Sequence, residues 1–256
     1  MPDPRPHLLI LGGTGEAVAL AHAVTEAGRM RVTSSLAGRT RAPRPIPGAM
    51  RVGGFGGAAG LRDWVETQKV DAIIDATHPF AAQISAHGAQ VAAGLETPLL
   101  RLVRPAWIAQ PGDDWRRVKD VASAARLVPQ VGRRAFLTTG VGDLSAFAAL
   151  DDMYFLIRVI DAPETLQKFA AYDSIEARGP FSQADEVRLF KTHRIDVLVA
   201  KNSGGDATVA KINAARDVGV PVVMIGRPSH IKYDGVKSVD SVEQALAWLE
   251  TTIKRV

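Results

Sequence analysis

The residues best suited to chemistry follow the first apolar run of the chain. There, Leu8 to Leu11 leads into the sequence Gly12-Gly13-Thr14-Gly15-Glu16. A strand, a glycine turn and a helix start are typical of the first crossover of a Rossmann fold. Glycines let the backbone approach a pyrophosphate, and the helix N-terminus stabilises its charge. We predict that these five residues bind a nucleotide. The alternative is a glycine turn without a ligand, since Val18 replaces the last glycine of the strict G-x-G-x-x-G pattern.

The end of the second apolar run indicates which nucleotide is bound. A protein that binds NAD usually carries an acidic residue there for the ribose hydroxyls, but no acid occurs from Arg31 to Met50. The hydroxyls of Ser34 and Ser35, and the guanidinium of Arg39 after Gly38, suit a 2′-phosphate instead. The sequence therefore favours NADPH over NADH. We expect Arg39→Ala to weaken the binding of NADPH far more than the binding of NADH. The alternative is that Arg39 is a solvated loop charge.

Polar residues also follow later apolar runs of the first half. In open α/β sheets, ligands bind beyond the carboxyl ends of the strands. Thr77 and His78 follow one such run, and we predict that they position the nicotinamide and belong to the catalytic site. Alternatively, His78 only caps a helix that begins near Phe80. Arg104 follows the next run, and we predict that it contacts an anionic substrate.

The second half carries a matching set at its predicted strand ends. Lys201 ends an apolar strand, where a charged side chain is unexpected unless it has a partner. We therefore place it in the catalytic site and in contact with substrate. Arg104 and Arg227 are equivalent in an internal repeat of the chain, so one can be structural while the other binds. For Ser182, the alternative to substrate binding is that it only forms part of a turn before a helix. The predicted substrate-binding residues of this half are Thr139, Gly140, Ser182, Lys201, Asn202, Ser203, Gly204 and Arg227.

Alternating apolar runs and amphipathic stretches must position these residues. Several runs are apolar nearly throughout, which is typical of parallel strands covered by helices on both faces. Strands are predicted over 7–11, 31–36, 70–76, 98–103, 134–139, 153–160, 195–201 and 220–225. Helices are predicted over 15–27, 58–68, 80–93, 120–128, 142–149, 183–193, 206–218 and 241–252.

The internal repeat is weak and has an offset of 121–127 residues. Residues 98–105 match 221–228, and residues 8–15 are echoed by 135–142. We predict an α/β protein of two Rossmann-like halves, over 1–131 and 132–256, with mainly parallel sheets and a substrate cleft between them. Because each half finishes with a loop, a short strand and a helix, the terminal strands could also be exchanged. A strand at 236–240 in the first sheet would support exchange.

Composition narrows the functional class. The 256 residues include no cysteine, which excludes disulfides and thiolate metal sites, and the six histidines show no paired ligand spacing, so no metal is predicted. A net charge of +4 comes from scattered residues without an aromatic RNA-binding signature, so no nucleic-acid partner is expected. No signal peptide or membrane span is recognised, and we expect a cytoplasmic protein. The sequence is compatible with a monomer and with a dimer.

Several motifs together resemble the precorrin-6A reductase family of cobalamin biosynthesis. They cover nearly the whole chain, and the most specific are Asp-Ala-Thr-His-Pro-Phe and Lys-Asn-Ser-Gly-Gly. The matching segments are residues 11–16, 75–81, 104–105, 138–140, 178–181 and 200–205.

The resemblance implies NADPH-dependent reduction of one double bond of precorrin-6A, an anionic tetrapyrrole, to give precorrin-6B. The many carboxylates of such a substrate agree with the cationic strand ends. Three alternatives stay open at this point. They are a cobalt-precorrin-6A reductase of the anaerobic route, a non-catalytic two-lobed anion-binding protein, and a group transferase with a nucleotide-linked donor.

Overall fold

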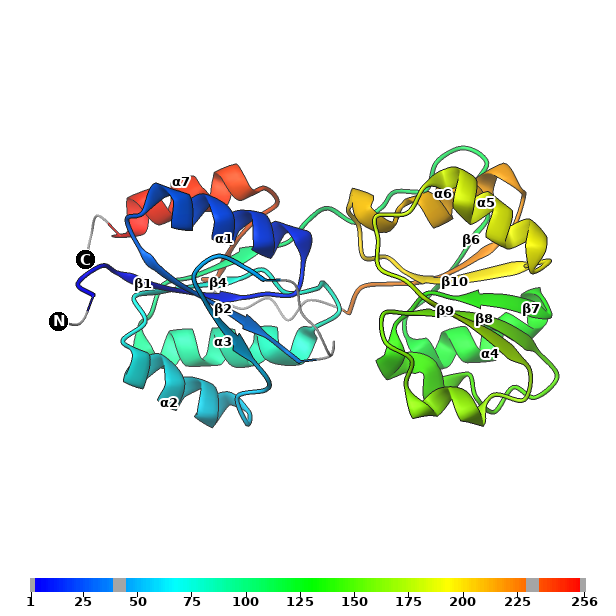
Figure 1. The fold of residues 1–256 in the computed structure, drawn as a ribbon, viewed down its shortest axis with the longest axis horizontal. Coiled ribbons are helices and arrows are strands. Elements are labelled where there is room, and N and C mark those ends of the chain that lie inside the picture. The colour runs from blue at the N-terminus through cyan, green and yellow to red at the C-terminus, as the bar shows by residue number, and fades with distance from the viewer. Residues whose placement is uncertain (1–2, 39–44, 229–234, 254–256) are drawn as a thin grey trace. The chain divides into compact units, whose positions relative to one another are not determined.

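The computed structural model describes residues 3–38, 45–228 and 235–253 and divides the chain into two compact units (Figure 1). Unit 1 consists of Met1–Pro105 together with Ser229–Val256, and unit 2 consists of Ala106–Pro228. The expected division at residue 131 therefore differs from the observed one. The segment 106–131 lies in unit 2, and the segment after 228 returns to unit 1.

Strands and helices alternate in both units. Unit 1 contains β1 (His7–Leu11), α1 (Gly15–Ala27), β2 (Arg31–Leu36), β3 (Ala49–Val52), α2 (Ala58–Gln68), β4 (Ala72–Asp75), α3 (Ala82–Leu95), β5 (Leu99–Leu102), β12 (Lys237–Val239) and α7 (Val242–Ile253). Unit 2 contains β6 (Trp115–Val118), α4 (Val121–Val131), β7 (Arg134–Leu137), η1 (Val141–Ala146), β8 (Tyr154–Val159), η2 (Glu164–Lys168), β9 (Tyr172–Glu176), α5 (Gln183–Thr192), β10 (Val197–Lys201), η3 (Asp206–Thr208), α6 (Ala210–Asp217) and β11 (Val222–Ile225). The elements written η are 3₁₀ helices.

Each unit has one six-stranded sheet in which every pairing is parallel. The order is β12-β5-β4-β1-β2-β3 in unit 1 and β6-β11-β10-β7-β8-β9 in unit 2. Both correspond to the Rossmann strand order. The sixth strand of each sheet comes from the other half of the sequence, because β12 pairs with β5 and β6 pairs with β11. The terminal strands are thus exchanged, which is why the unit boundaries differ from a simple division into halves.

Burial explains why these strands occupy the centre. All five residues of β1 are buried, and alternate side chains reach opposite faces of the sheet. Leu8 and Ile10 pack into a core with α1 and α7, whereas Leu9 and Leu11 pack with α2 and α3. Helices thereby cover both faces of the unit 1 sheet, as Figure 1 shows. In unit 2, one face of the sheet packs against α5 and α6 through Phe136 and neighbouring apolar residues.

Two predicted helices take a different form. The one expected over 142–149 is the 3₁₀ helix η1, whose sequence begins Val-Gly-Asp after Gly140. Glycine at the second position disfavours a full α-helix. The one expected over 206–218 begins as η3 and continues as α6. The edge strands β3 and β9 were not predicted, because most of their residues are not buried and they lack long apolar runs.

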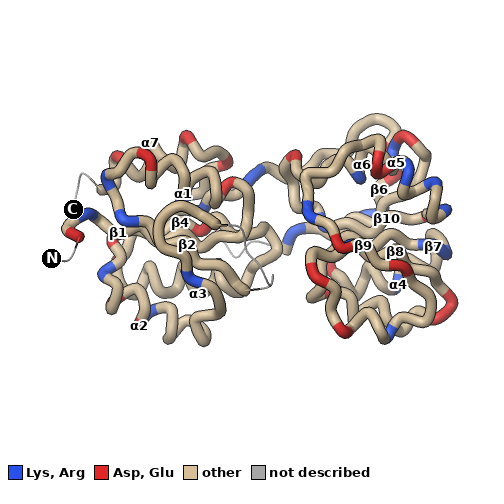
Figure 2. The backbone as a smooth tube through the Cα atoms, in the orientation of Figure 1, with Lys and Arg blue, Asp and Glu red and all other residues tan. Residues whose placement is uncertain are grey.

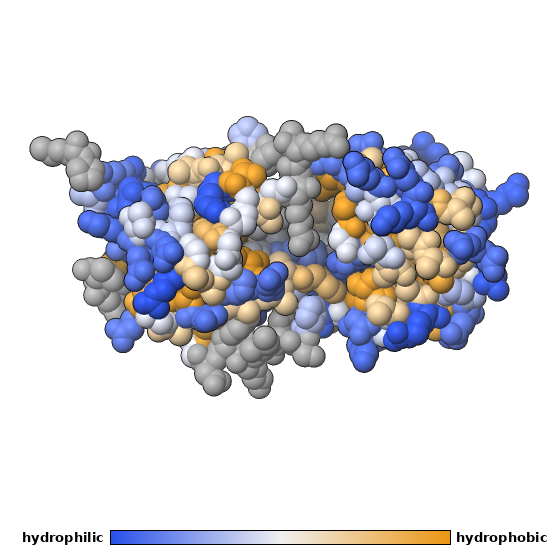
Figure 3. All heavy atoms as spheres, turned by 90° about the horizontal axis from the view of Figure 1, so that it is seen from below, coloured by the Kyte–Doolittle hydropathy of each residue, from blue (hydrophilic) through white to orange (hydrophobic). Residues whose placement is uncertain are grey.

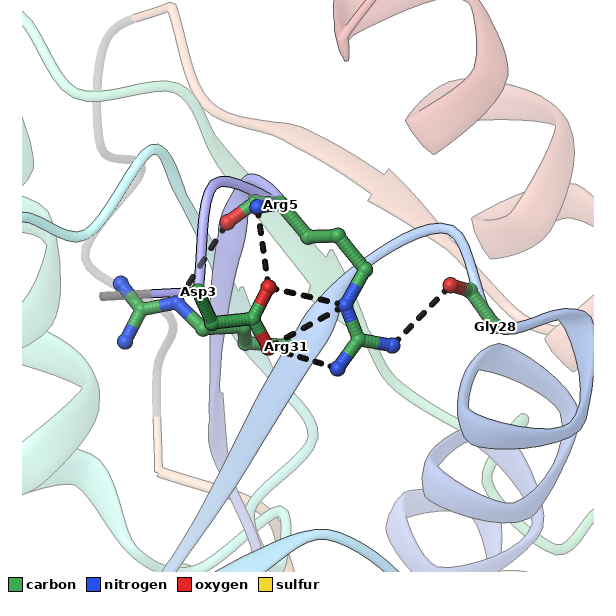
Figure 4. Close-up of polar contacts among 4 residues, drawn as sticks. All are labelled: Asp3, Arg5, Gly28 and Arg31. Atoms are coloured by element: carbon green, nitrogen blue, oxygen red, sulfur yellow. Dashed lines mark hydrogen bonds and ion pairs between the residues drawn. The ribbon is translucent and has the colours of Figure 1, made fainter. Parts of the chain in front are cut away.

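The segment before β1 is fastened to unit 1 by polar contacts (Figure 4). Arg5 forms a 2.6 Å ion pair with Asp3 and donates to the Gly28 carbonyl oxygen at 3.0 Å. The Arg31 guanidinium donates to the carbonyl oxygen of Arg5 at 3.4 Å. The hydrogen bonds from Arg5 lower the pKa of the Asp3 carboxyl group to about 2. This network fixes the entry of the chain into the sheet.

The surface carries both signs of charge. Acidic and basic residues are interspersed over both units in Figure 2. The face drawn in Figure 3 shows hydrophobic residues among hydrophilic ones. Within residues 3–38, 45–228 and 235–253, no helix has the length and apolar character needed to span a bilayer.

Candidate functional site

The glycine turn lies between β1 and α1, at the carboxyl edge of the unit 1 sheet. The Gly12 amide donates to the Ser35 carbonyl oxygen at 2.9 Å, which ties the turn to β2. Gly13 has a φ of +116°, a conformation that favours glycine. A Cβ placed on Gly13 or on Gly15 would meet no atom within 4 Å. The backbone at these two positions therefore faces open space in which a ligand could approach closely.

Thr14 organises the start of α1. Its hydroxyl accepts a hydrogen bond from the Ala17 amide at 3.1 Å and donates to the Ala76 carbonyl oxygen at 2.8 Å. Thr14 is thus the N-cap of a 13-residue helix and links the turn to the end of β4. Glu16, in the first turn, forms a 3.0 Å ion pair with Arg104. Arg104 thus pairs with Glu16 inside unit 1 and fixes a carboxylate beside the turn.

The residues predicted for the ribose side lie at the end of β2. Ser34 and Ser35 are both buried, and the Ser34 hydroxyl has no hydrogen-bond partner among the described residues. The Ser35 hydroxyl accepts from Arg51 Nη1 at 3.5 Å. Gly38 has a φ of +73° and lies beyond this strand end. Arg39 lies outside the described residues.

A buried carboxylate fixes Thr77 at the end of β4. Asp75 is 1% exposed, and its Oδ1 accepts from the amide and the hydroxyl of Thr77 at 3.1 and 2.7 Å. Its Oδ2 accepts from Arg101 Nε at 3.3 Å. Asp75 is not among the residues predicted for the site. The motif Asp-Ala-Thr-His-Pro-Phe nevertheless indicates it, because an acid within an apolar strand must be satisfied by partners.

His78 follows Thr77 on the same edge. Its Nδ1 accepts a hydrogen bond from the Phe80 amide at 3.3 Å, and in the neutral ring this places the proton on Nε2. α3 begins at Ala82, and its N-cap residue Ala81 makes no side-chain capping bond. The Phe80 amide bound by His78 lies in the turn before α3, and a purely capping role of His78 stays the alternative prediction.

The glycine turn of unit 2 follows β7. Gly140 has a φ of +93°, and a Cβ there would meet open space. Thr139 is 7% exposed, and its hydroxyl has no hydrogen-bond partner among the described residues. The neighbouring Thr138 instead donates to the Val199 carbonyl oxygen at 2.9 Å. Of the two threonines, only Thr139 has a hydroxyl without a partner in the described chain.

Lys201 ends β10 and faces Asp143, an acid that is not among the predicted site residues. Its Nζ lies 2.5 Å from Asp143 Oδ2, and the two side chains are 18% and 16% exposed. Asp143 stands one residue after Gly142, as Glu16 stands after Gly15, so the repeat could have indicated it. Each unit therefore joins an acid of its glycine turn to a cation at another strand end.

The loop after β10 is held by its own side chains. Asn202 exchanges hydrogen bonds with the backbone of Trp107, at 2.8 Å and 3.1 Å. Arg227 donates to the carbonyl oxygens of Asn202 and Ser203 at 2.9 and 3.1 Å. Gly204 has a φ of +67°, which suits the tight turn. The side chains of Asn202 and Arg227 therefore shape this loop.

Ser182 lies at the start of α5 and is its N-cap. Its hydroxyl accepts from the Asp185 amide at 3.2 Å and lies 2.6 Å from the Asp185 carboxylate. These contacts agree with the interpretation of Ser182 as a turn residue. They place its hydroxyl in helix capping.

Comparison with known proteins identifies related chains over almost the full length. The model of the family described as precorrin-6x reductase CbiJ/CobK matches residues 7–250. A protein of Rhodococcus erythropolis named precorrin-6A reductase is 50% identical over 248 residues, covering 97% of this chain and 99% of the relative. A protein of Priestia megaterium named cobalt-precorrin-6A reductase is 30% identical over 242 residues, covering 90% and 94%.

A solved structure extends the likeness to the fold. The structure entitled CobK precorrin-6A reductase matches with a TM-score of 0.90 and 39% identity, covering 96% of this chain and 97% of the other. The two-sheet architecture is therefore shared with a protein of that name.

Proposed function

The chain belongs to the precorrin-6x reductase CbiJ/CobK family, and from this premise we propose that it reduces precorrin-6A to precorrin-6B with NADPH in cobalamin biosynthesis. It is an oxidoreductase that acts on a CH–CH bond. The observation that carries the proposal is the 50% identity that extends over 97% of the chain. The cytoplasm as its place of action stays a prediction.

The glycine turn of unit 1 fits the pyrophosphate of a dinucleotide. Open space at Gly13 and Gly15 would admit the phosphates, and the amides at the start of α1 would donate to them. Glu16 stands close to this position, and its ion pair with Arg104 offsets a negative charge that would otherwise repel the ligand. Thr77 and His78, held by Asp75 and Phe80, would position the nicotinamide.

The carboxyl edge of unit 2 fits an anionic macrocycle. Lys201 would contact substrate carboxylates, and the buried Thr139 hydroxyl would donate to the same ligand. Two exposed apolar side chains stand at neighbouring strand ends of this edge. They are Val141, 42% exposed after β7, and Ile160, 44% exposed after β8. Such side chains suit the apolar faces of a tetrapyrrole ring.

The chain contributes binding and orientation to the reaction. NADPH, when bound, would supply a hydride to a ring carbon that is conjugated to a C=N group, and the nitrogen of that group can carry the compensating charge. Fixed threonine and lysine side chains would hold the macrocycle in line, and the surrounding apolar side chains would exclude water. No single acid residue of the chain is assigned as the proton donor.

Anaerobic oxidation of NADPH in the presence of precorrin-6A tests the activity directly. We expect turnover with the cobalt-free substrate and less with its cobalt form. The relative named for the cobalt-free reaction is 50% identical and the one named for the cobalt reaction is 30% identical. Binding of precorrin-6A without turnover would favour a non-catalytic binding protein. A requirement for a nucleotide-linked donor would favour a transferase.

Lys201→Ala tests the substrate side. We expect KM for precorrin-6A to rise, or kcat to fall, by about 10-fold or more, because a charge-assisted contact is lost. NADPH binding, followed by its fluorescence, should not change. Lys191→Ala is the matched control, because Lys191 lies in the last turn of α5. Equal kinetics for Lys201→Ala and wild type would make Lys201 a structural residue.

A further inference from the structure

Arg51 stands where a Rossmann sheet would meet the ribose that carries a 2′-phosphate. It lies on β3 directly opposite Ser35 of β2 in the parallel register. Its Nη1 is 3.5 Å from the Ser35 hydroxyl, so both side chains occupy one face of the sheet at its carboxyl edge. The end of β2 is the position that discriminates between the two nicotinamide nucleotides.

The guanidinium of Arg51 is held firmly, but by neutral groups only. It donates to the carbonyl oxygens of Gly53 and Gly54, the latter at 2.7 Å, and lies 3.7 Å from the centre of the Phe55 ring. Within the described part of the chain, no carboxylate forms an ion pair with it. Burial lowers the pKa of Arg51, which indicates that its charge is partly desolvated.

Two other arginines of unit 1 show the contrast. Arg101 is paired with Asp75 and Arg104 with Glu16. Partly buried charges are normally paired, since desolvation without compensation is unfavourable. Among the described residues, Arg51 has no such acidic partner and keeps a positive charge at the edge of the sheet. Its stack on Phe55 fixes the orientation of the guanidinium plane.

The hydrogen-bonding capacity of Arg51 is not exhausted by these contacts. A guanidinium has five N–H donors, and the bonds to the two carbonyl oxygens and to Ser35 come only from its terminal nitrogens. The remaining donors form a planar fork that matches phosphate oxygens. The loop after β3 bends through Gly53, Gly56 and Gly57, where a Cβ would meet open space, so a ligand has room beside it.

We propose that Arg51, together with the Ser35 hydroxyl, binds the 2′-phosphate of NADPH and thereby selects NADPH over NADH. This inference rests on the proposed function and adds a specificity-determining residue to it. Arg51 lies twelve residues beyond Arg39, the residue that the sequence indicated for the same role. Arg51 is identified by its strand register and its contacts, both of which depend on the fold.

Calorimetric titration of the whole protein with 2′,5′-ADP and with 5′-AMP tests the proposal. These probes differ by one phosphate group. Arg51→Gln should weaken the affinity for 2′,5′-ADP by about 10- to 100-fold, because hydrogen bonds to a charged group are lost. Binding of 5′-AMP should change by less than about twofold. Arg62→Gln is the matched control, because Arg62 is exposed on α2 and pairs only with Glu66 at 3.6 Å among the described residues; it should leave both affinities unchanged.

The outcomes separate this inference from the proposed function. If Arg51→Gln weakens both probes equally, or neither, Arg51 only supports the loop and the inference is wrong. If the wild-type protein binds 5′-AMP but gains nothing from the 2′-phosphate, the NADPH assignment itself is wrong. Should Arg51→Gln lose its thermal unfolding transition, Arg51→Lys takes its place. It keeps the charge but loses the fork, and a selective loss of 2′,5′-ADP affinity is again expected.

Discussion

The two glycine turns of the molecule each contain a glycine with a positive φ, but they lead into helices of different kinds. Gly13 and Gly140 both have positive φ values, +116° and +93°, at the carboxyl end of the central strand of their sheets. In unit 1 the turn leads into the 13-residue helix α1 with Thr14 as its cap. In unit 2 it leads into the six-residue η1, whose N-cap makes no side-chain bond. Only α1 offers the dipole and the amides of a full α-helix to an anion.

The second strands differ as well. Ser35 lies opposite Leu11 of β1, and the register of β7 and β8, continued by one residue, brings Arg158 to the same position in unit 2. Arg158 pairs with the buried Glu186 at 2.8 Å. Its guanidinium also lies 3.9 Å from the centre of the Phe181 ring. In unit 2, the ion pair of Arg158 and Glu186 thus occupies the end of the second strand. In unit 1, the same position carries the small hydroxyl groups of Ser34 and Ser35. One repeated fold can therefore carry two different sets of contacts, because these depend on a few strand-end residues.

The largest effect is expected from breaking the ion pair that distinguishes unit 2. Glu186→Gln leaves Arg158 as an uncompensated buried charge and should lower the free energy of unfolding by about 3–5 kcal/mol. The double variant Arg158→Met/Glu186→Leu should lose far less free energy of unfolding, because apolar side chains can replace a buried ion pair. In unit 1, the position that Glu186 has in α5 is taken in α2 by the fully buried Leu61. Urea denaturation measures both. Equal losses for the single and double variants would contradict this account.

An intermediate effect is expected at the two glycine turns. Gly13→Ala should lower NADPH affinity by about 10-fold or more, because a methyl group would occupy the space that we propose for the phosphates and the positive φ would be strained. Gly140→Ala has comparable backbone strain and should leave NADPH affinity unchanged. Fluorescence titration of both variants makes the comparison. A similar loss of affinity in both would mean that the turns do not differ in function.

The smallest effect concerns the first residues of the central strands, His7 and Arg134. His7 is 2% exposed and contacts the Thr33 hydroxyl through Nε2 at 2.8 Å. Burial lowers its pKa, so below about pH 6.5 the unfolded chain binds more protons than the folded one. The stability that neutral His7 contributes is present above about pH 6.5 and is lost as the pH falls through the window below it.

The expected slope from His7 is at most about 1.4 kcal/mol per pH unit. Urea denaturation at about pH 7.5 and about pH 5.5 measures it, and His7→Gln should reduce the difference between the two. The counterpart position in unit 2, the first residue of β7, is Arg134 and therefore lacks the imidazole to which this slope is attributed. An unchanged pH dependence in His7→Gln would show that other groups cause it.

The sequence predicted much of the fold because the central elements carry strong periodic signals. β1, β2, α1 and α2 have the predicted bounds, and each contributes buried residues to the core. β3 and β9 were not predicted, because they are edge strands with few buried apolar residues and so lack the apolar runs that indicate a strand. Strand exchange could only be left open, since β6 and β12 resemble each other and local sequence does not decide which sheet each one completes.

For the candidate site, the sequence located strand-end residues but not their partners. Arg104 and Arg227 look equivalent in the repeat, yet one pairs with Glu16 and the other holds the loop after β10. Arg51 and Asp143 were not singled out, because their significance lies in contacts with residues distant in sequence. Such contacts follow from strand register, which composition and spacing do not specify.

The exchange of sixth strands also sets an order of events during synthesis. Unit 2 is continuous, so all of its strands exist once residue 228 has been made. Unit 1 begins first but lacks β12 and α7 until Ser229–Val256 has been added. At about 5–20 residues per second, translation of unit 2 takes roughly 6–25 seconds, and during this time the edge of β5 has no neighbouring strand. Unit 1 is thus the first unit to be translated and the last to have a complete sheet.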